Sequence, residues 1–155
     1  MVDLVDLYRA GTVPDSLRVL DSVTHGRMLT VRGLDWRGAH DVFTRAAASR
    51  FFPWAGKRFQ HLDRNEGTGI NRIRLAGERL WYPFRTRIEP SAIDGAPCIA
   101  LDYDLPENPS LIRALRDELR EVSPGLFLGP ALFQALRKPR LVMFFACDAR
   151  PPLPH

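Results

Sequence analysis

The sequence predicts one α+β domain that is mainly antiparallel β. We expect a small barrel or strongly curled sheet with N-terminal helices and one helix inserted before the last two strands. Three observations indicate this class: apolar residues recur at helical spacing in the first third, the segments after residue 53 alternate with a period of two, and the last two strands are apolar on both faces. The length of 155 residues favours a single domain, predicted over 1–148, followed by a loose Pro-rich tail over 149–155.

Residues 1–52 form the predicted helical part of the domain. Leucines and a tyrosine at helical spacing indicate a helix over 2–10, which Gly11 would end. Pro14 opens a second short helix that Gly26 would close. Two further segments complete this part, a short strand over 27–32 and a third helix over 41–50.

Residues 53–148 form the predicted β-rich part. Alternating side chains indicate strands over 68–75, 80–89 and 97–105. The Asp-Gly pair at 94–95 is typical of a hairpin turn between the last two of these strands. We therefore expect these segments to pair in an antiparallel sheet.

A helix is predicted over 108–122, before the last two strands. Asn108 can cap its first turn, Pro109 suits that turn, and leucines every four residues from Leu111 form an apolar stripe. Its charged residues are interpreted as a solvated face.

The last two predicted strands, 126–133 and 141–147, are apolar on both faces. A sheet with one face in water would alternate, so both faces of these strands need a cover. One cover would be the barrel interior, and the other would be the inserted helix, the N-terminal helices or a partner subunit.

The composition excludes several classes of partner. The net charge is +4, but the arginines are spread along the chain, whereas a nucleic-acid-binding surface concentrates them, so we expect no nucleic-acid partner. The four histidines are scattered, and Cys98 and Cys147 stand in apolar strands, so we expect no metal, no cofactor and two buried free thiols. We find neither a membrane-spanning apolar run nor a secretion signal, and we predict a cytoplasmic location.

The segment from Trp54 to Phe59 combines an aromatic residue, a glycine, a cation and a second aromatic residue. In one interpretation the two aromatic side chains pack on an apolar ligand, while Lys57 meets its carboxylate or carbonyl as a point charge. In the other, they anchor a loop in the core and Lys57 is solvated. The predicted ligand-binding residues are Trp54, Lys57, Phe59, Asn71, Tyr82, Tyr103, Phe127 and Phe145.

Asp102 and Asp104 are expected on one face of a strand. Paired carboxylates can raise one another's pKa and supply an acid and a base. Alternatively, they form ion pairs with arginines of neighbouring strands. Together with Tyr103 and Lys57, they are the candidate catalytic residues.

The order of several short motifs resembles bacterial uncharacterised small proteins of the GXWXG type. The resemblance runs from about residue 20 to 147 and implies a lipocalin-like barrel without an established activity. The motifs that carry it are Trp54-x-Gly56-Lys57-x-Phe59, Gly69-x-Asn71, the strand around Tyr82, Leu101-Asp102-Tyr103-Asp104 and Gly125-Leu126-Phe127-Leu128-Gly129.

These observations leave three functional hypotheses. In the first, the barrel binds a small hydrophobic or amphipathic molecule. In the second, the same cavity belongs to an isomerase, cyclase or hydrolase of a hydrophobic substrate. In the third, the last two strands form a homodimer interface in a structural or interaction protein.

Overall fold

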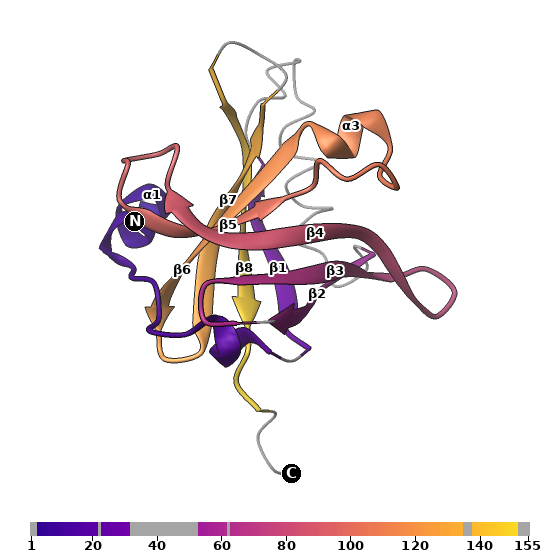
Figure 1. The fold of residues 1–155 in the computed structure, drawn as a ribbon, viewed down its shortest axis with the longest axis horizontal. Coiled ribbons are helices and arrows are strands. Elements are labelled where there is room, and N and C mark those ends of the chain that lie inside the picture. The colour runs from indigo at the N-terminus through magenta and orange to yellow at the C-terminus, as the bar shows by residue number, and fades with distance from the viewer. Residues whose placement is uncertain (1–2, 22, 32–52, 62, 135–137, 152–155) are drawn as a thin grey trace.

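The computed structural model describes residues 3–21, 23–31, 53–61, 63–134 and 138–151. Its centre is one antiparallel sheet of eight strands in the order β1-β8-β7-β6-β5-β4-β3-β2 (Figure 1). The strands are β1 (His25–Val31), β2 (Trp54–His61), β3 (Glu66–Arg74), β4 (Glu78–Pro90), β5 (Pro97–Asp102), β6 (Leu115–Ser123), β7 (Leu126–Phe133) and β8 (Arg140–Asp148). Helix α1 (Leu4–Ala10), the 3-10 helix η1 (Leu17–Leu20) and the short helix α3 (Ser110–Arg113) complete the described elements. The predicted class, mainly antiparallel β with a barrel, is confirmed.

The sheet curls until its two end strands meet, which makes a nearly closed barrel. Thr24, just before β1, donates its backbone N–H to the carbonyl oxygen of Lys57 in β2 at 2.8 Å. The Thr24 hydroxyl donates to the same oxygen at 3.0 Å. Gly56 makes this approach possible, because its φ is 130° and a Cβ atom there would collide with the Thr24 carbonyl and with Gly26.

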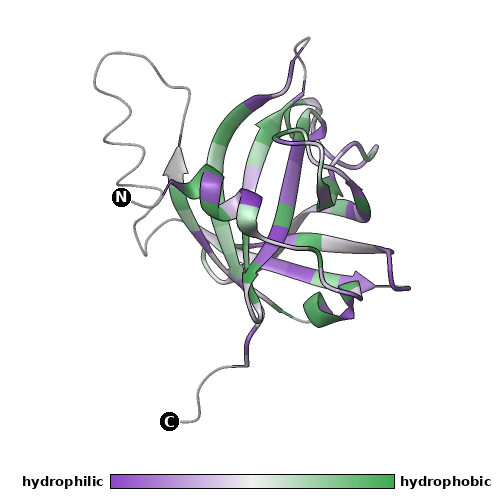
Figure 2. Ribbon diagram, turned by 90° about the vertical axis from the view of Figure 1, so that its left-hand side faces the viewer, coloured by the Kyte–Doolittle hydropathy of each residue, from purple (hydrophilic) through white to green (hydrophobic). Residues whose placement is uncertain are grey.

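Alternation along the strands separates the barrel interior from the surface. In β4, Phe84 and Thr86 are buried while Arg85 and Arg87 are exposed, as the sequence pattern predicted. Apolar and polar residues alternate in this way along several strands (Figure 2). The interior core consists of Leu17, Leu20, Phe59, Phe84, Ile99, Leu101, Tyr103, Leu119, Phe127, Ala131, Phe145 and Cys147.

Helix α1 covers the outer face of the last strands. Asp3 caps it by accepting a hydrogen bond from the backbone N–H of Val5, and Gly11 follows its last residue as predicted. Tyr8 packs edge-on against Phe144 at 6.4 Å between ring centroids, in a cluster that also contains Leu128. The predicted need for two covers is therefore met by the barrel interior and an N-terminal helix.

The predicted helix over 108–122 is wrong for most of its length. Helix α3 has only four residues, and Leu111, placed on the buried stripe, is 69% exposed. Strand β6 takes the remaining residues, so that Leu115 and Leu119 share the inner face because a spacing of four also fits a period of two.

The charged residues that the helix prediction placed on one solvated face lie instead on both sides of strand β6. Glu118 is fully buried on the outer side, where it accepts hydrogen bonds from the Tyr8 hydroxyl at 2.9 Å and the Ser91 hydroxyl at 2.5 Å. Arg120 is also buried there, and its guanidinium binds both carboxylate oxygens of Asp94 at 2.7 and 2.8 Å. These contacts tie β6 to α1 and to the turn before β5.

Several smaller predictions also change. The segment Trp54–His61 is strand β2 rather than a loop, and β1 begins at His25, so that Gly26 lies inside a strand instead of ending a helix.

Cys98 and Cys147 are free and buried, which confirms the prediction of two buried free thiols. The predicted helix over 41–50 and the tail residues 152–155 lie outside the described residues. In the part of the chain that the structure describes, no helix has the length and apolar character to cross a membrane.

Candidate functional site

A cavity of about 270 Å³ lies in the barrel interior. Most of its wall is apolar, and four polar side chains gather on one part of it. The lining residues are Met28, Trp54, Lys57, Asn71, Ile73, Tyr82, Tyr103, Ile112, Leu115, Asp117, Ala131, Met143 and Phe145.

The polar part of the wall is built around the ammonium group of Lys57, whose side chain is only 2% exposed. Its Nζ atom lies 2.7 Å from Asp117 Oδ2, 2.6 Å from the Tyr103 hydroxyl and 3.0 Å from Asn71 Oδ1. The Tyr103 hydroxyl also donates to Asp117 Oδ2 at 2.8 Å. We call these four residues the Lys57 cluster. Burying a charge of this kind requires an opposite charge and hydrogen bonds, and the cluster supplies both.

Local irregularities in β2 bring Lys57 and Trp54 to the same side of the sheet. The register of β2 against β3 shifts between Trp54 and Gly56, which marks a β-bulge. Trp54 and Lys57 therefore both face the cavity although they are three residues apart, where regular alternation would place them on opposite faces. The indole N–H of Trp54 then donates to Asn71 Oδ1 at 3.0 Å.

A second irregularity positions Asn71. The register between β3 and β4 shifts after Ile70, and Tyr82 adopts a left-handed backbone conformation with φ of 59°. The Tyr82 carbonyl accepts a hydrogen bond from Asn71 Nδ2 at 3.1 Å, and the same amide group donates to the Tyr103 hydroxyl at 3.2 Å. Backbone strain of about 1–3 kcal/mol at Tyr82 is thus retained next to the cluster.

The electrostatics of the cluster keep the Tyr103 hydroxyl protonated. Burial raises the pKa of Tyr103 well above its usual range, and the adjacent Asp117 carboxylate raises it further. Lys57 Nζ also lies 5.0–5.5 Å from the ring centroids of four aromatic residues, so the cation faces several π systems. Those residues are Trp54, Phe84, Tyr103 and Phe145.

The structure brings most of the predicted ligand-binding residues together. Six of them line the cavity: Trp54, Lys57, Asn71, Tyr82, Tyr103 and Phe145. Phe59 and Phe127 lie in the core outside this lining, where Phe59 packs edge-on against Phe84 at 5.5 Å. A role in ligand binding stays a prediction for all eight.

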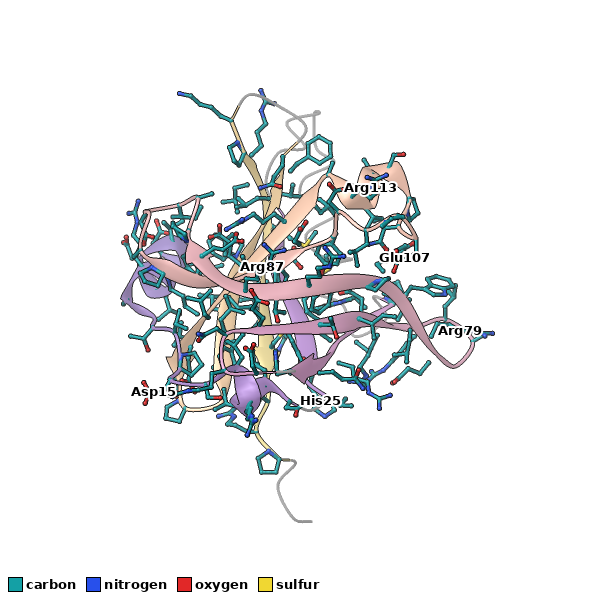
Figure 3. All side chains as sticks on the ribbon, viewed as in Figure 1. Asp15, His25, Arg79, Arg87, Glu107 and Arg113 are labelled. Atoms are coloured by element: carbon teal, nitrogen blue, oxygen red, sulfur yellow. The ribbon has the colours of Figure 1, made fainter. Side chains whose placement is uncertain are left out.

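The candidate catalytic residues separate into two groups. Lys57 and Tyr103 lie in the cluster, whereas Asp102 and Asp104 are absent from the residues that line the cavity. Asp102 accepts a hydrogen bond from the backbone N–H of Asp104 at 2.9 Å. Asp104 forms an exposed ion pair at 2.7 Å with Arg113, which projects from α3 at the periphery of the molecule (Figure 3). Their roles in acid–base chemistry remain predictions.

Asp117 is the residue of the cluster that the sequence interpretation missed. The helical stripe placed it on a solvated face, yet it lies between Leu115 and Leu119 at a spacing of two, which is the pattern of one strand face. An acidic residue between two inward-facing leucines was the available signal. The second signal was Lys57, a cation between the aromatic residues Trp54 and Phe59, which supplies the opposite charge.

Comparison with known proteins gives one structural match and no assignment. No family model matches the chain, and no curated protein matches it, so the GXWXG-type resemblance does not become a family assignment. A crystal structure described only as a protein from Thermomonospora curvata is similar, with a TM-score of 0.53 and 14% sequence identity. The match covers 94% of this chain and 84% of that one. At this identity the similarity shows a shared fold.

Proposed function

We propose that this protein binds a small amphipathic molecule inside the barrel. The supporting observation is a cavity whose wall is mostly apolar and carries one compact polar cluster. Ligand sites in proteins have this composition, with an apolar lining for the body of the ligand and a few polar groups that orient it. The apolar body would lie among Trp54, Phe145 and Met143, and the polar end would meet the Lys57 cluster.

The cavity volume guides the choice of probe. A dry apolar cavity of about 150 Å³ holds one benzene molecule. By proportion, about 270 Å³ holds a molecule of roughly ten to twelve non-hydrogen atoms. Chains or rings of about ten carbon atoms with one polar group are therefore the appropriate probes.

Isothermal titration calorimetry with 2-decanol, 2-decanone and decanoate tests the proposal. We expect at least one of these probes to bind with a stoichiometry of one. Ala131→Phe should abolish this binding, because Ala131 lines the cavity and a phenyl ring would fill part of it. Ala92→Phe is the matched control, since Ala92 is exposed in the turn before β5.

Absence of heat from all three probes, together with an unchanged melting temperature, would contradict the proposal. Equal binding by Ala131→Phe and the wild type would contradict it as well. Both variants need a native circular dichroism spectrum, because overpacking a barrel interior typically costs about 1–3 kcal/mol.

A further inference from the structure

The hydrogen-bonding capacity of the Lys57 cluster is almost completely used within the protein. An ammonium group has three donors, and Lys57 directs them at Asn71, Tyr103 and Asp117. A phenolic hydroxyl has one donor and two acceptor sites. The Tyr103 hydroxyl donates to Asp117 and accepts from Lys57 and Asn71. Neither residue keeps a free donor for a ligand.

Asn71 is equally saturated. Its two amide hydrogens go to the Tyr82 carbonyl and the Tyr103 hydroxyl. Its carbonyl oxygen accepts from Lys57 and from the Trp54 indole. The amide therefore holds the cluster together and offers a ligand neither a donor nor an acceptor.

Asp117 is the exception within the cluster. Both of its hydrogen bonds fall on Oδ2, and no residue that the structure describes donates to Oδ1. The side chain is only 9% exposed, and it lines the cavity. Because Asp117 lines the cavity and its Oδ1 accepts no hydrogen bond from the described residues, this oxygen is the open acceptor of the Lys57 cluster.

We infer that the cavity selects a ligand whose polar group is a neutral hydrogen-bond donor, of the class of an apolar alcohol, and that Asp117 Oδ1 accepts its hydrogen. This inference rests on the proposed function and specifies the ligand class for the same cavity. The hydroxyl hydrogen would complete the carboxylate, while the carbon skeleton would fill the apolar space.

The charges of the cluster argue against other polar groups. A ligand carboxylate would find no free donor on Lys57, Tyr103 or Asn71, and it would face the negative charge of Asp117. A ketone or ether supplies only acceptors, which would leave Oδ1 unsatisfied. A protonated amine can donate, but the cavity would then hold two buried positive charges against the single carboxylate of Asp117.

The calorimetric series in the wild-type protein tests this inference directly. The alcohol 2-decanol and the ketone 2-decanone share one carbon skeleton, and only the alcohol has a donor. We expect 2-decanol to bind at least tenfold more tightly than 2-decanone, which is about 1.4 kcal/mol, and decanoate to bind most weakly. Equal or tighter binding of the ketone or of decanoate would overturn the inference while leaving cavity binding intact. Failure of all three probes would instead remove the proposed function.

Two variants locate the recognition on Asp117. In Asp117→Asn, only the amide oxygen can accept from Lys57 and Tyr103, so the NH₂ group must take the place of Oδ1. The position then donates instead of accepting, and the advantage of the alcohol over the ketone should disappear. Persistence of a tenfold preference in this variant would overturn the assignment.

Tyr82→Phe tests the second hydroxyl of the cavity wall. Unlike the Tyr103 hydroxyl, that of Tyr82 has no hydrogen bond to a described residue. Whatever its effect on the two affinities, the tenfold ratio between alcohol and ketone should persist, because Asp117 remains. Loss of the ratio here would assign recognition to Tyr82 instead. If Asp117→Asn does not fold, the wild-type series and Tyr82→Phe still decide the question.

Discussion

Lys57 and Asp117 place opposite charges in a barrel interior whose other residues are mostly apolar. Their side chains are 2% and 9% exposed, so water screens their attraction poorly and hydrates neither charge well. Such a pair contributes little net stability relative to apolar residues of the same shape, but losing one partner leaves an uncompensated charge. We therefore interpret the pair as a feature retained for the site rather than for the core.

Replacement of Asp117 should be far more damaging than replacement of a surface aspartate. Asp117→Ala leaves the Lys57 ammonium buried without a counter-charge, and we expect a loss of about 3–5 kcal/mol in the free energy of unfolding. Asp104→Ala is the matched control, because its ion pair with Arg113 is 60% and 44% exposed and should contribute less than about 1 kcal/mol. Urea denaturation measures both. Similar losses in the free energy of unfolding for the two variants would mean that water hydrates the Lys57–Asp117 pair in the native protein.

Both thiols should make the protein sensitive to alkaline pH. Burial raises the pKa of Cys98 to about 12 and that of Cys147 to about 11, whereas an unfolded thiol ionises near 8.5. The native state then holds more protons than the unfolded state above pH 8.5. Its stability is complete below that pH and falls as the pH rises through 11 and 12, by up to about 1.4 kcal/mol per pH unit for each thiol.

Urea unfolding between pH 7 and 10 measures this dependence. Cys147→Ala should make the decline shallower, because one of the two linked protons is removed. Iodoacetamide at pH 8 should label neither thiol before unfolding. A flat profile, or rapid labelling of the native protein, would show that the thiols are not shielded as the structure has them.

At the scale of elements, the contact between β1 and β2 determines whether the sheet closes. Gly56 combines a φ of 130° with direct contact to Gly26 and the Thr24 carbonyl. The same glycine follows the bulge that turns Trp54 and Lys57 toward the cavity. Closure of the barrel and construction of the site therefore depend on one short stretch of β2.

Gly56→Ala should destabilise the barrel more than an alanine at another glycine with positive φ. Gly77 has a φ of 108°, but a Cβ atom there would meet no atom within 4 Å. Gly77→Ala thus measures backbone strain alone, about 1–3 kcal/mol, while Gly56→Ala adds a clash at the seam between β1 and β2. Thermal and urea denaturation compare them. Equal losses in the free energy of unfolding would mean that the contact between β1 and β2 accommodates the added methyl group without loss of stability.

Strand β6 shows why one element was assigned to the wrong class. Its leucines are four residues apart, a spacing that fits both the helical period and the strand period. The deciding feature, an acidic residue on each side of the strand, depends on partners far along the chain: Lys57 for Asp117, and Tyr8 and Ser91 for Glu118. Local periodicity carries no information about those partners.

At the scale of the whole molecule, the barrel class followed from alternation in β4 and β5 and from two final strands that needed two covers. Two strands were missed for physical reasons. The bulge in β2 interrupts the alternation of its side chains, and the leucine spacing in β6 fits the helical period as well as the strand period. The candidate site was recovered in part, because aromatic and cationic residues on separate strands indicated a lined cavity. Its completion by Asp117 required the three-dimensional pairing of β6 with its neighbours.

The measurement that tests the central claim most directly is a fluorescence titration with 2-decanol in three proteins: the wild type, Trp54→Phe and Trp81→Phe. Trp54 lines the cavity, whereas Trp81 is 42% exposed and is not among the lining residues. A ligand in the barrel should change the emission of the wild type and of Trp81→Phe to a similar extent, and Trp54→Phe should lose most of that change. An unchanged spectrum in the wild type, or a response that disappears with Trp81 and survives without Trp54, would contradict binding in the barrel cavity.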